Sequence, residues 1–260
     1  MDIIKTISQE LNIKTWQTEA TIKLIDEGNT IPFIARYRKE VTGSLNDEVL
    51  RQFHERLLYL RNLEEKKAQV LASIAEQGKL TTELRNAVEA AATMVAVEDL
   101  YRPYRPKRRT RAIIAKEKGL ESLANILLLQ MTKKPLEEEA ADYISEEKGV
   151  GSAQEALEGA KDILAEMISD SADYRTYIRK LTMNEGKIIS KARDEKEKSV
   201  YENYYDYEEA VSKIPGHRIL AINRGEKEKF LTVRIGAPEE KILRYLEKQV
   251  IRRDNSRKRI

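Results

Sequence analysis

The longest helical pattern in the chain is residues 47–77, DEVLRQFHERLLYLRNLEEKKAQVLASIAEQ. Its apolar residues recur at the spacing that places them on one face of a helix. They are Val49, Leu50, Phe53, Leu57, Leu60, Leu63, Val70, Leu71 and Ile74. Gly78 follows the pattern and is a typical helix stop. A helix of this length spans about 45 Å, so we expect it to act as a strut across more than one subdomain.

Three shorter helices are predicted before this one. Residues 3–11 carry an apolar stripe at helical spacing. Thr15 is the expected N-cap of a second helix, which stops at Gly28. A third helix is predicted over residues 31–38, with Pro32 tolerated in its first turn.

Residues 16–39 are therefore similar to a helix-turn-helix. In that motif the first residues of the second helix meet the base edges. Here these are residues 31–34, IPFI, which we expect to lie in a core. The basic residues Arg36, Arg38 and Lys39 come at the other end of the helix. The pattern therefore favours a helix-turn-helix fold, but not a second helix that recognises base sequence.

The pattern stays helical through the middle of the chain. Thr81 opens one helix, and residues 120–131 form a nearly all-apolar helix that we expect to be buried on every side. Residues 136–145 are amphipathic with an acidic face. Ser152 and Glu155 form a capping box, the clearest helix start in the chain.

The pattern changes after Gly186. Residues 186–192, GKIISKA, and 230–235, FLTVRI, are typical of short strands. A last helix is predicted over residues 239–251. The basic end, residues 252–260, has no apolar periodicity, and we expect it to fray.

These patterns together predict a mainly α protein with a long strut helix and a small α/β element near the C-terminal end. Ala, Glu, Leu, Lys and Arg make up about half of the chain, which is typical of long helices. We divide the chain into a helix-turn-helix-like N-terminal helical subdomain that runs into the long helix, a central helical subdomain and a small α/β segment. Their predicted ranges are 1–78, 79–185 and 186–260.

Composition excludes several kinds of chemistry. The chain has no cysteine, and its two histidines, His54 and His217, lie far apart in the sequence. No phosphate-binding loop, nucleophile elbow or zinc-protease motif occurs. Pairs of carboxylates fall on predicted helix surfaces, where solvated faces are the ordinary explanation. We expect no catalytic residues, no metal and no cofactor.

Nothing in the sequence predicts a membrane segment. The longest uncharged apolar stretch, residues 122–132, is shorter than the roughly 20 residues that span a bilayer. The N-terminus, MDIIKTISQELN, lacks the apolar core of a signal peptide. We therefore expect a soluble, cytoplasmic protein that does not bind membranes.

Positive charge is concentrated in residues 100–112, LYRPYRPKRRTRA. Residues 101–118 carry eight basic side chains and one acidic side chain, whereas the whole chain has a net charge of +3. Such a segment can neutralise phosphates without reading sequence, and interleaved tyrosines can stack on bases. The candidate nucleic-acid-binding residues are Tyr101, Arg102, Tyr104, Arg105, Lys107, Arg108, Arg109 and Arg111.

Two interpretations of this segment stay open. Pro103 and Pro106 should hold it extended and out of a helix, so that its basic side chains can face a nucleic acid. Alternatively, the segment is a structural connector whose arginines pair with acidic helices such as the one that contains Glu137–Glu139.

Three segments of the chain resemble, in the same order, segments of the Tex family of bacterial transcription accessory proteins. They are TIPFIARYRKEVTGSL (30–45), VEDLYRPYRPKRRTRAIIAKEKGLESLA (97–124) and IPGHRILAINRGEKEKFL (214–231). The resemblance implies large cytoplasmic proteins related to a eukaryotic transcription elongation factor, with this chain matching the N-terminal third. An RNase H-like domain, a helix-hairpin-helix pair and an OB-type RNA-binding domain would then follow Ile260, and nucleic-acid binding would rest chiefly on that later part.

We therefore expect the chain to be a non-catalytic helical scaffold of a Tex-like transcription accessory protein. Its expected partners are nucleic acid, RNA or DNA, bound weakly, and RNA polymerase or its associated factors. Two alternatives remain, an autonomous module that binds nucleic acid without sequence preference and a helical scaffold that binds only proteins. The salt dependence of nucleic-acid binding separates them, because only phosphate contacts give a steep dependence.

Overall fold

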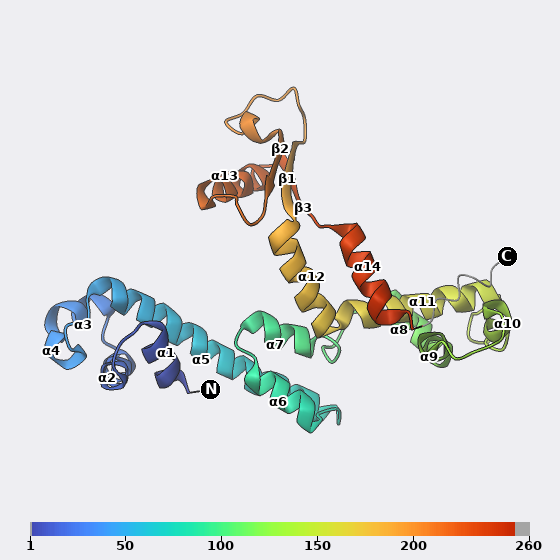
Figure 1. The fold of residues 1–260 in the computed structure, drawn as a ribbon, viewed down its shortest axis with the longest axis horizontal. Coiled ribbons are helices and arrows are strands. Elements are labelled where there is room, and N and C mark those ends of the chain that lie inside the picture. The colour runs from blue at the N-terminus through green and yellow to red at the C-terminus, as the bar shows by residue number, and fades with distance from the viewer. Residues whose placement is uncertain (1, 253–260) are drawn as a thin grey trace. The chain divides into compact units, whose positions relative to one another are not determined.

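The computed structural model describes residues 2–252, which form fourteen α-helices and one three-stranded sheet (Figure 1). The chain divides into two compact units, Met1–Arg105 and Pro106–Ile260. The predicted boundaries at residues 78 and 185 instead fall inside these units. The first falls there because the long helix packs on the two helices that follow it. The predicted mainly α fold with a small strand-containing element is confirmed.

The N-terminal unit is entirely helical. Its helices are α1 (Ile3–Glu10), α2 (Thr15–Asp26), α3 (Ile31–Tyr37), α4 (Lys39–Thr42), α5 (Asp47–Glu76), α6 (Thr82–Ala90) and α7 (Met94–Tyr101). The predicted long helix is confirmed as α5. The Asn46 side chain accepts a hydrogen bond from the Val49 amide at 2.8 Å, and Gly78 takes a positive φ of 67° just beyond the end of the helix.

Helix α5 organises the core of this unit. Its first turns join Leu24, Ile34 and Leu45 in one small cluster. The rest of its apolar face packs in a larger cluster with α1, α6 and α7. Both clusters lie in the N-terminal unit, so α5 joins two apolar clusters within one compact unit.

Two details of the first helices differ from expectation. Thr15 is the first helical residue and not the cap; the preceding Lys14 amide donates to Gln17 Oε1 at 3.1 Å. At the start of α3, only Ile34 is buried, whereas Pro32 and Phe33 are exposed. Because α3 is short, only one of its faces meets α5. Whether α2 and α3 act as a helix-turn-helix stays a prediction.

The C-terminal unit contains the remaining helices. They are α8 (Arg111–Glu117), α9 (Glu121–Leu129), α10 (Leu136–Ala141), α11 (Ala153–Asp170), α12 (Ala172–Glu185), α13 (Gly216–Lys227) and α14 (Glu239–Val250). Helix α11 is central and packs on α8, α9 and α10 through small residues such as Ala156 and Ala160. The Ser152 hydroxyl caps it as predicted, but the Glu155 carboxylate accepts from the Gly151 amide instead of closing the box on Ser152.

The prediction that residues 120–131 are buried on every side is wrong. Leu123 and Ala124 are fully buried, but Leu129 is 49% exposed and Met131 is 73% exposed. Helix α9 lies at the edge of its unit, so one face meets α11 and the other meets solvent. Helix α10 also ends at Ala141, before the predicted end at residue 145.

The sheet has the antiparallel order β2–β1–β3, and α13 packs on β3 (Figure 1). Strands β1 (Lys187–Ala192) and β3 (Leu231–Gly236) confirm the two predicted strands. Strand β2 (Asp206–Ala210), which follows a short 3₁₀ turn at Glu202–Tyr204, was missed. Its sequence, DYEEA, lacks the apolar alternation that identifies a half-buried strand.

None of the helices that the structure describes is long and apolar enough to cross a membrane. The predicted fraying of the basic end concerns residues 252–260, of which all but Arg252 lie outside the described range.

Candidate nucleic-acid interface

The basic segment joins the two units. It leaves α7 at Tyr101 and enters α8 at Arg111, and residues 102–110 are not helical. Its first half is a turn and not extended as predicted: the Tyr104 and Arg105 amides both donate to the Tyr101 carbonyl, at 2.9 and 3.0 Å. The turn forms because these amides can continue the hydrogen-bond pattern of α7 past Pro103, which has no amide of its own.

Both tyrosines of the segment are anchored to α5. The Tyr101 hydroxyl and the Ser73 hydroxyl share a hydrogen bond of 3.0 Å, and the Tyr104 carbonyl accepts from the Gln77 side chain at 2.9 Å. The two side chains are partly buried against the large apolar cluster of the N-terminal unit. The structure thus gives both tyrosines a packing role, and their predicted stacking on bases stays a prediction.

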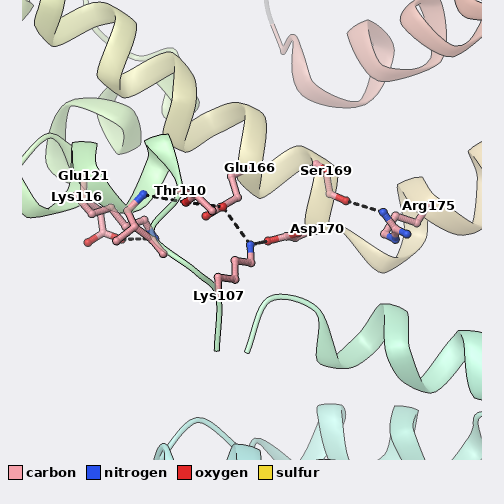
Figure 2. A network of polar contacts seen from close by, with 9 residues as sticks. Lys107, Thr110, Lys116, Glu121, Glu166, Ser169, Asp170 and Arg175 are labelled. Carbon is pink, nitrogen blue, oxygen red and sulfur yellow. Dashed lines mark hydrogen bonds and ion pairs between the residues drawn. The ribbon is translucent and has the colours of Figure 1, made fainter. Parts of the chain in front are cut away.

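Lys107 is held by two carboxylates at the end of α11 (Figure 2). Its Nζ lies 3.3 Å from Glu166 and also pairs with Asp170, whose side chain is only 9% exposed. The Thr110 hydroxyl donates to Glu166 at 3.0 Å and accepts from the Ile113 amide at 3.2 Å, which caps α8. A carboxylate as buried as that of Asp170 needs a positively charged partner. The contact with Lys107 therefore holds the start of α8 on α11.

The sequence interpretation did not identify Glu166 and Asp170 as partners of this segment. They lie four residues apart in α11, and this spacing places two side chains on the same face of a helix. In the sequence, only this spacing indicated that the two carboxylates could bind one basic side chain together. It does not say which basic residue the two carboxylates hold, because the contact joins residues far apart in the sequence.

The arginines remain at the surface. The side chains of Arg105, Arg109 and Arg111 are 66%, 71% and 87% exposed. Each has one carboxylate nearby, at 3.9, 3.1 and 3.7 Å respectively. Exposed pairs of this kind contribute about 0–1 kcal/mol, so a phosphate can replace these partners at little cost. Arg102 and Arg108 are also exposed.

The structure therefore divides the predicted site residues into two groups. Tyr101 and Tyr104 hold the first part of the segment on α5 in the N-terminal unit, and Lys107 holds the second part on α11 in the C-terminal unit. The arginines project from the anchored segment into solvent; Arg102 and Arg105 belong to the N-terminal unit and Arg108, Arg109 and Arg111 to the C-terminal unit. This arrangement can attract phosphates, but nothing in it selects a base.

Metal chemistry has no evident site in the part of the chain that the structure describes. Across these residues, no group of three or more His, Cys, Asp or Glu side chains is placed to hold a metal ion. His54 is exposed on α5, and His217 lies in the first turn of α13, in the other unit.

Two family models match the chain. A family model described as "Tex-like protein N-terminal domain" matches residues 1–75, and one described as "Tex central region-like" matches residues 130–258. The chain belongs to the Tex-like family, and the two matches cover most of both units.

Individual relatives are similar to this chain over nearly its whole length. The YdcI protein of Bacillus subtilis (strain 168) is 48% identical over 249 residues, which are 95% of this chain and 35% of that protein. The transcriptional accessory protein Tex of Neisseria gonorrhoeae is 46% identical over 235 residues, 90% of this chain and 31% of the relative. The human S1 RNA-binding domain-containing protein 1 is 33% identical over 244 residues, 90% of this chain and 24% of the relative. The chain thus spans about a third or less of the length of these curated relatives.

Proposed function

We propose that this chain is a non-catalytic helical scaffold of a Tex-like transcription accessory protein and that its basic segment contacts nucleic acid without reading sequence. The names of two relatives support the proposal, since one is a transcriptional accessory protein and the other carries an S1 RNA-binding domain. A cytoplasmic location and contact with RNA polymerase or its associated factors belong to the same proposal.

The observation that carries the proposal is the exposure of the arginines on an anchored segment. The two tyrosines already fix the backbone beside Arg102 and Arg105, and Lys107 and Thr110 fix it before and after Arg108 and Arg109. Binding therefore costs less ordering entropy than it would for a loose basic tail. Arginine can form two parallel hydrogen bonds to one phosphate, so the segment can hold several phosphates of either RNA or DNA.

The test is the affinity of the 260-residue chain for a labelled single-stranded oligonucleotide, measured by fluorescence anisotropy at several salt concentrations. The variant is Arg105→Ala/Arg108→Ala/Arg109→Ala, and Lys107 is left unchanged because it holds α8 on α11. Non-specific affinities typically lie near 10⁻⁴–10⁻⁶ M. We expect the variant to bind the oligonucleotide more weakly. We also expect the log–log slope of its affinity against salt concentration to become shallower by about 0.7 for each single-strand phosphate that it no longer neutralises.

A matched control removes the same charge elsewhere. Arg85→Ala/Arg234→Ala/Arg244→Ala also replaces three exposed arginines, on α6, β3 and α14. The basic end of the chain is a weaker control, because Arg253, Arg257, Lys258 and Arg259 lie outside the described residues. Equal affinity and slope for both variants and the parent chain would contradict the proposed contact.

A scaffold that binds only proteins is the second candidate function. The observation that favours it is the anchoring itself, since Tyr101, Tyr104 and Lys107 all contact other parts of their own unit. In that case the segment is a connector between the units. The parent chain should then show no salt-dependent binding to the oligonucleotide.

A further inference from the structure

A second group of basic side chains surrounds a pocket in the N-terminal unit, away from the basic segment in sequence. The pocket has a volume of about 640 Å³ and lies between α3, α4 and the start of α5. Arg36, Lys39 and Arg51 line it together with one acidic residue, Asp47. The charged side chains around the pocket therefore have a net charge of +2.

Two of these cations are available to a ligand. Arg51 pairs with Asp47 at 2.7 Å, which neutralises the acidic charge of the pocket. Within residues 2–252, the side chains of Arg36 and Lys39 form no ion pair, and both are exposed. The neighbouring Arg38 does not line the pocket; its guanidinium lies over the Phe33 ring, 5.4 Å from the centroid, and donates to the Tyr37 carbonyl at 3.3 Å.

The turn that leads from α4 into the pocket wall at Ser44 is held by contacts with α2. Gly43 and Ser44 both take a positive φ of 63°, which turns the chain from α4 toward α5. The Gln17 side chain donates to the Thr42 and Gly43 carbonyls at 2.9 and 3.3 Å and holds this turn on α2. A Cβ on residue 43 would lie 2.5 Å from the Trp16 ring, so the turn also packs closely.

The rest of the wall combines polar residues, Ser44 and Asn46, with an apolar part. Pro32, Ala35 and Leu45 contribute the apolar part, and Leu45 is 8% exposed. Pockets that hold small organic ligands have volumes of about 300–1,000 Å³ and combine apolar walls with a few placed polar groups. Two free cations beside an apolar wall suit a phosphate attached to a planar, weakly polar group. That is the chemistry of a nucleotide.

We propose that Arg36 and Lys39 bind the phosphate of a nucleotide unit in this pocket, with the sugar or base against Pro32 and Ala35. The inference deepens the proposed nucleic-acid contact and rests on it for one source of the phosphate, a single-stranded nucleic acid. The other source is a free nucleotide. Both present the same phosphate group to the two side chains.

The experiment uses the ¹⁵N-labelled 260-residue chain and two probes, adenosine 5′-monophosphate and a single-stranded oligonucleotide. Backbone amide signals of residues 43–47 report on the pocket. The test variant is Arg36→Ala/Lys39→Ala, and the matched control is Arg85→Ala/Lys79→Ala, which removes one exposed arginine and one exposed lysine from the same unit. Circular dichroism confirms that each variant is folded.

The proposal expects the 43–47 signals to shift with a probe in the parent chain and the control but not in the test variant. If the oligonucleotide is the ligand, the log–log slope of its affinity against salt concentration becomes shallower by about 1.4 in the test variant. This is about 0.7 for each of the two cations removed. Shifts with adenosine 5′-monophosphate alone assign the pocket to a free nucleotide and contradict the nucleic-acid source.

Two results would contradict the proposed binding of a nucleotide unit in the pocket. One is an equal loss of affinity in the test variant and the control, which means that only the overall charge matters. The other is the absence of any shift at residues 43–47 with either probe, even if the Arg105/Arg108/Arg109 variant loses oligonucleotide binding. In that second case the proposed function stands without the pocket.

Discussion

Lys67 places a positive charge inside the N-terminal unit. Its side chain is 4% exposed, and its Nζ donates to Glu64 and to the Glu89 carbonyl, both at 2.9 Å. The second contact ties α5 to the end of α6. The sequence interpretation did not identify Lys67 as buried, because the periodicity of the helix is carried by its apolar residues alone.

Replacing Lys67 with Met should therefore destabilise the chain. The substitution keeps the aliphatic length but leaves the Glu89 carbonyl without this donor, which costs about 1–3 kcal/mol. The measurement is the free energy of unfolding in urea. Lys79→Met is the control, since Lys79 is exposed and a change there should stay within about 0.5 kcal/mol. Similar values for the two variants would show that the buried contact contributes nothing.

The pair formed by Arg61 and Asp26 should make stability depend on pH. Arg61 donates to both carboxylate oxygens of Asp26, at 2.7 and 2.9 Å, and these hydrogen bonds lower the pKa of Asp26 from its ordinary value of 3.8. A carboxylate whose pKa is lowered by folding stabilises the fold above its ordinary value. That stability is lost as the pH falls through the lower, folded-state pKa.

We expect Asp26→Asn to be less stable than the parent chain at pH 7 by under about 1 kcal/mol, because the pair is exposed. The difference should shrink toward zero below pH 3.8. Urea unfolding at pH 7 and at pH 3 measures both values. A difference as large at pH 3 as at pH 7 would assign the effect to something other than the charge of Asp26.

Among the elements, helices were predicted well because their signals are local. The start of α5 at Asp47, the cap at Ser152 and the strands β1 and β3 all follow from residues a few positions apart. Features that depend on distant contacts were missed. The one-sided burial of α9 and the burial of Lys67 are both set by which neighbour packs on the helix.

In the candidate site, too, local features could be predicted from the sequence and features set by distant contacts could not. The cluster of arginines is visible in the sequence, whereas the anchoring of Lys107 on α11 is not, since it joins residues far apart in the chain. The pocket beside Arg36 and Lys39 was also not predictable, because Arg51 reaches it from a different helix.

Helix α11 offers a prediction about packing. Replacing glycine with alanine inside a helix usually stabilises it by about 0.5–1 kcal/mol. At Gly159, however, a Cβ would lie 2.4 Å from the Leu120 side chain. We expect Gly159→Ala to destabilise the chain by about 1–3 kcal/mol.

Thermal unfolding measures this effect, with Gly216→Ala as the control. Gly216 lies in the first turn of α13 and has open space around its Cβ position. The control should unfold at or above the temperature of the parent chain. Stabilisation by Gly159→Ala would mean that Leu120 moves aside without cost.

For the whole molecule, the proposal is a scaffold without catalysis. Neither the motifs of the sequence nor the described structure brings together a phosphate-binding loop or a metal-binding group of side chains. We expect the purified chain to show no nuclease or nucleoside-triphosphatase activity above background. Activity that survives repeated purification and is abolished by a single carboxylate substitution would overturn this expectation.

The sheet has a consequence for how copies of the chain behave in a crowded solution. Strand β2 is an edge of the sheet, and an edge strand offers unpaired backbone groups to any other strand that meets it. Asp206, Glu208 and Glu209 lie on this strand. A second copy of β2 laid beside it would bring carboxylates against carboxylates. The acidic residues that hide the strand from sequence interpretation thus oppose the pairing of two copies along β2.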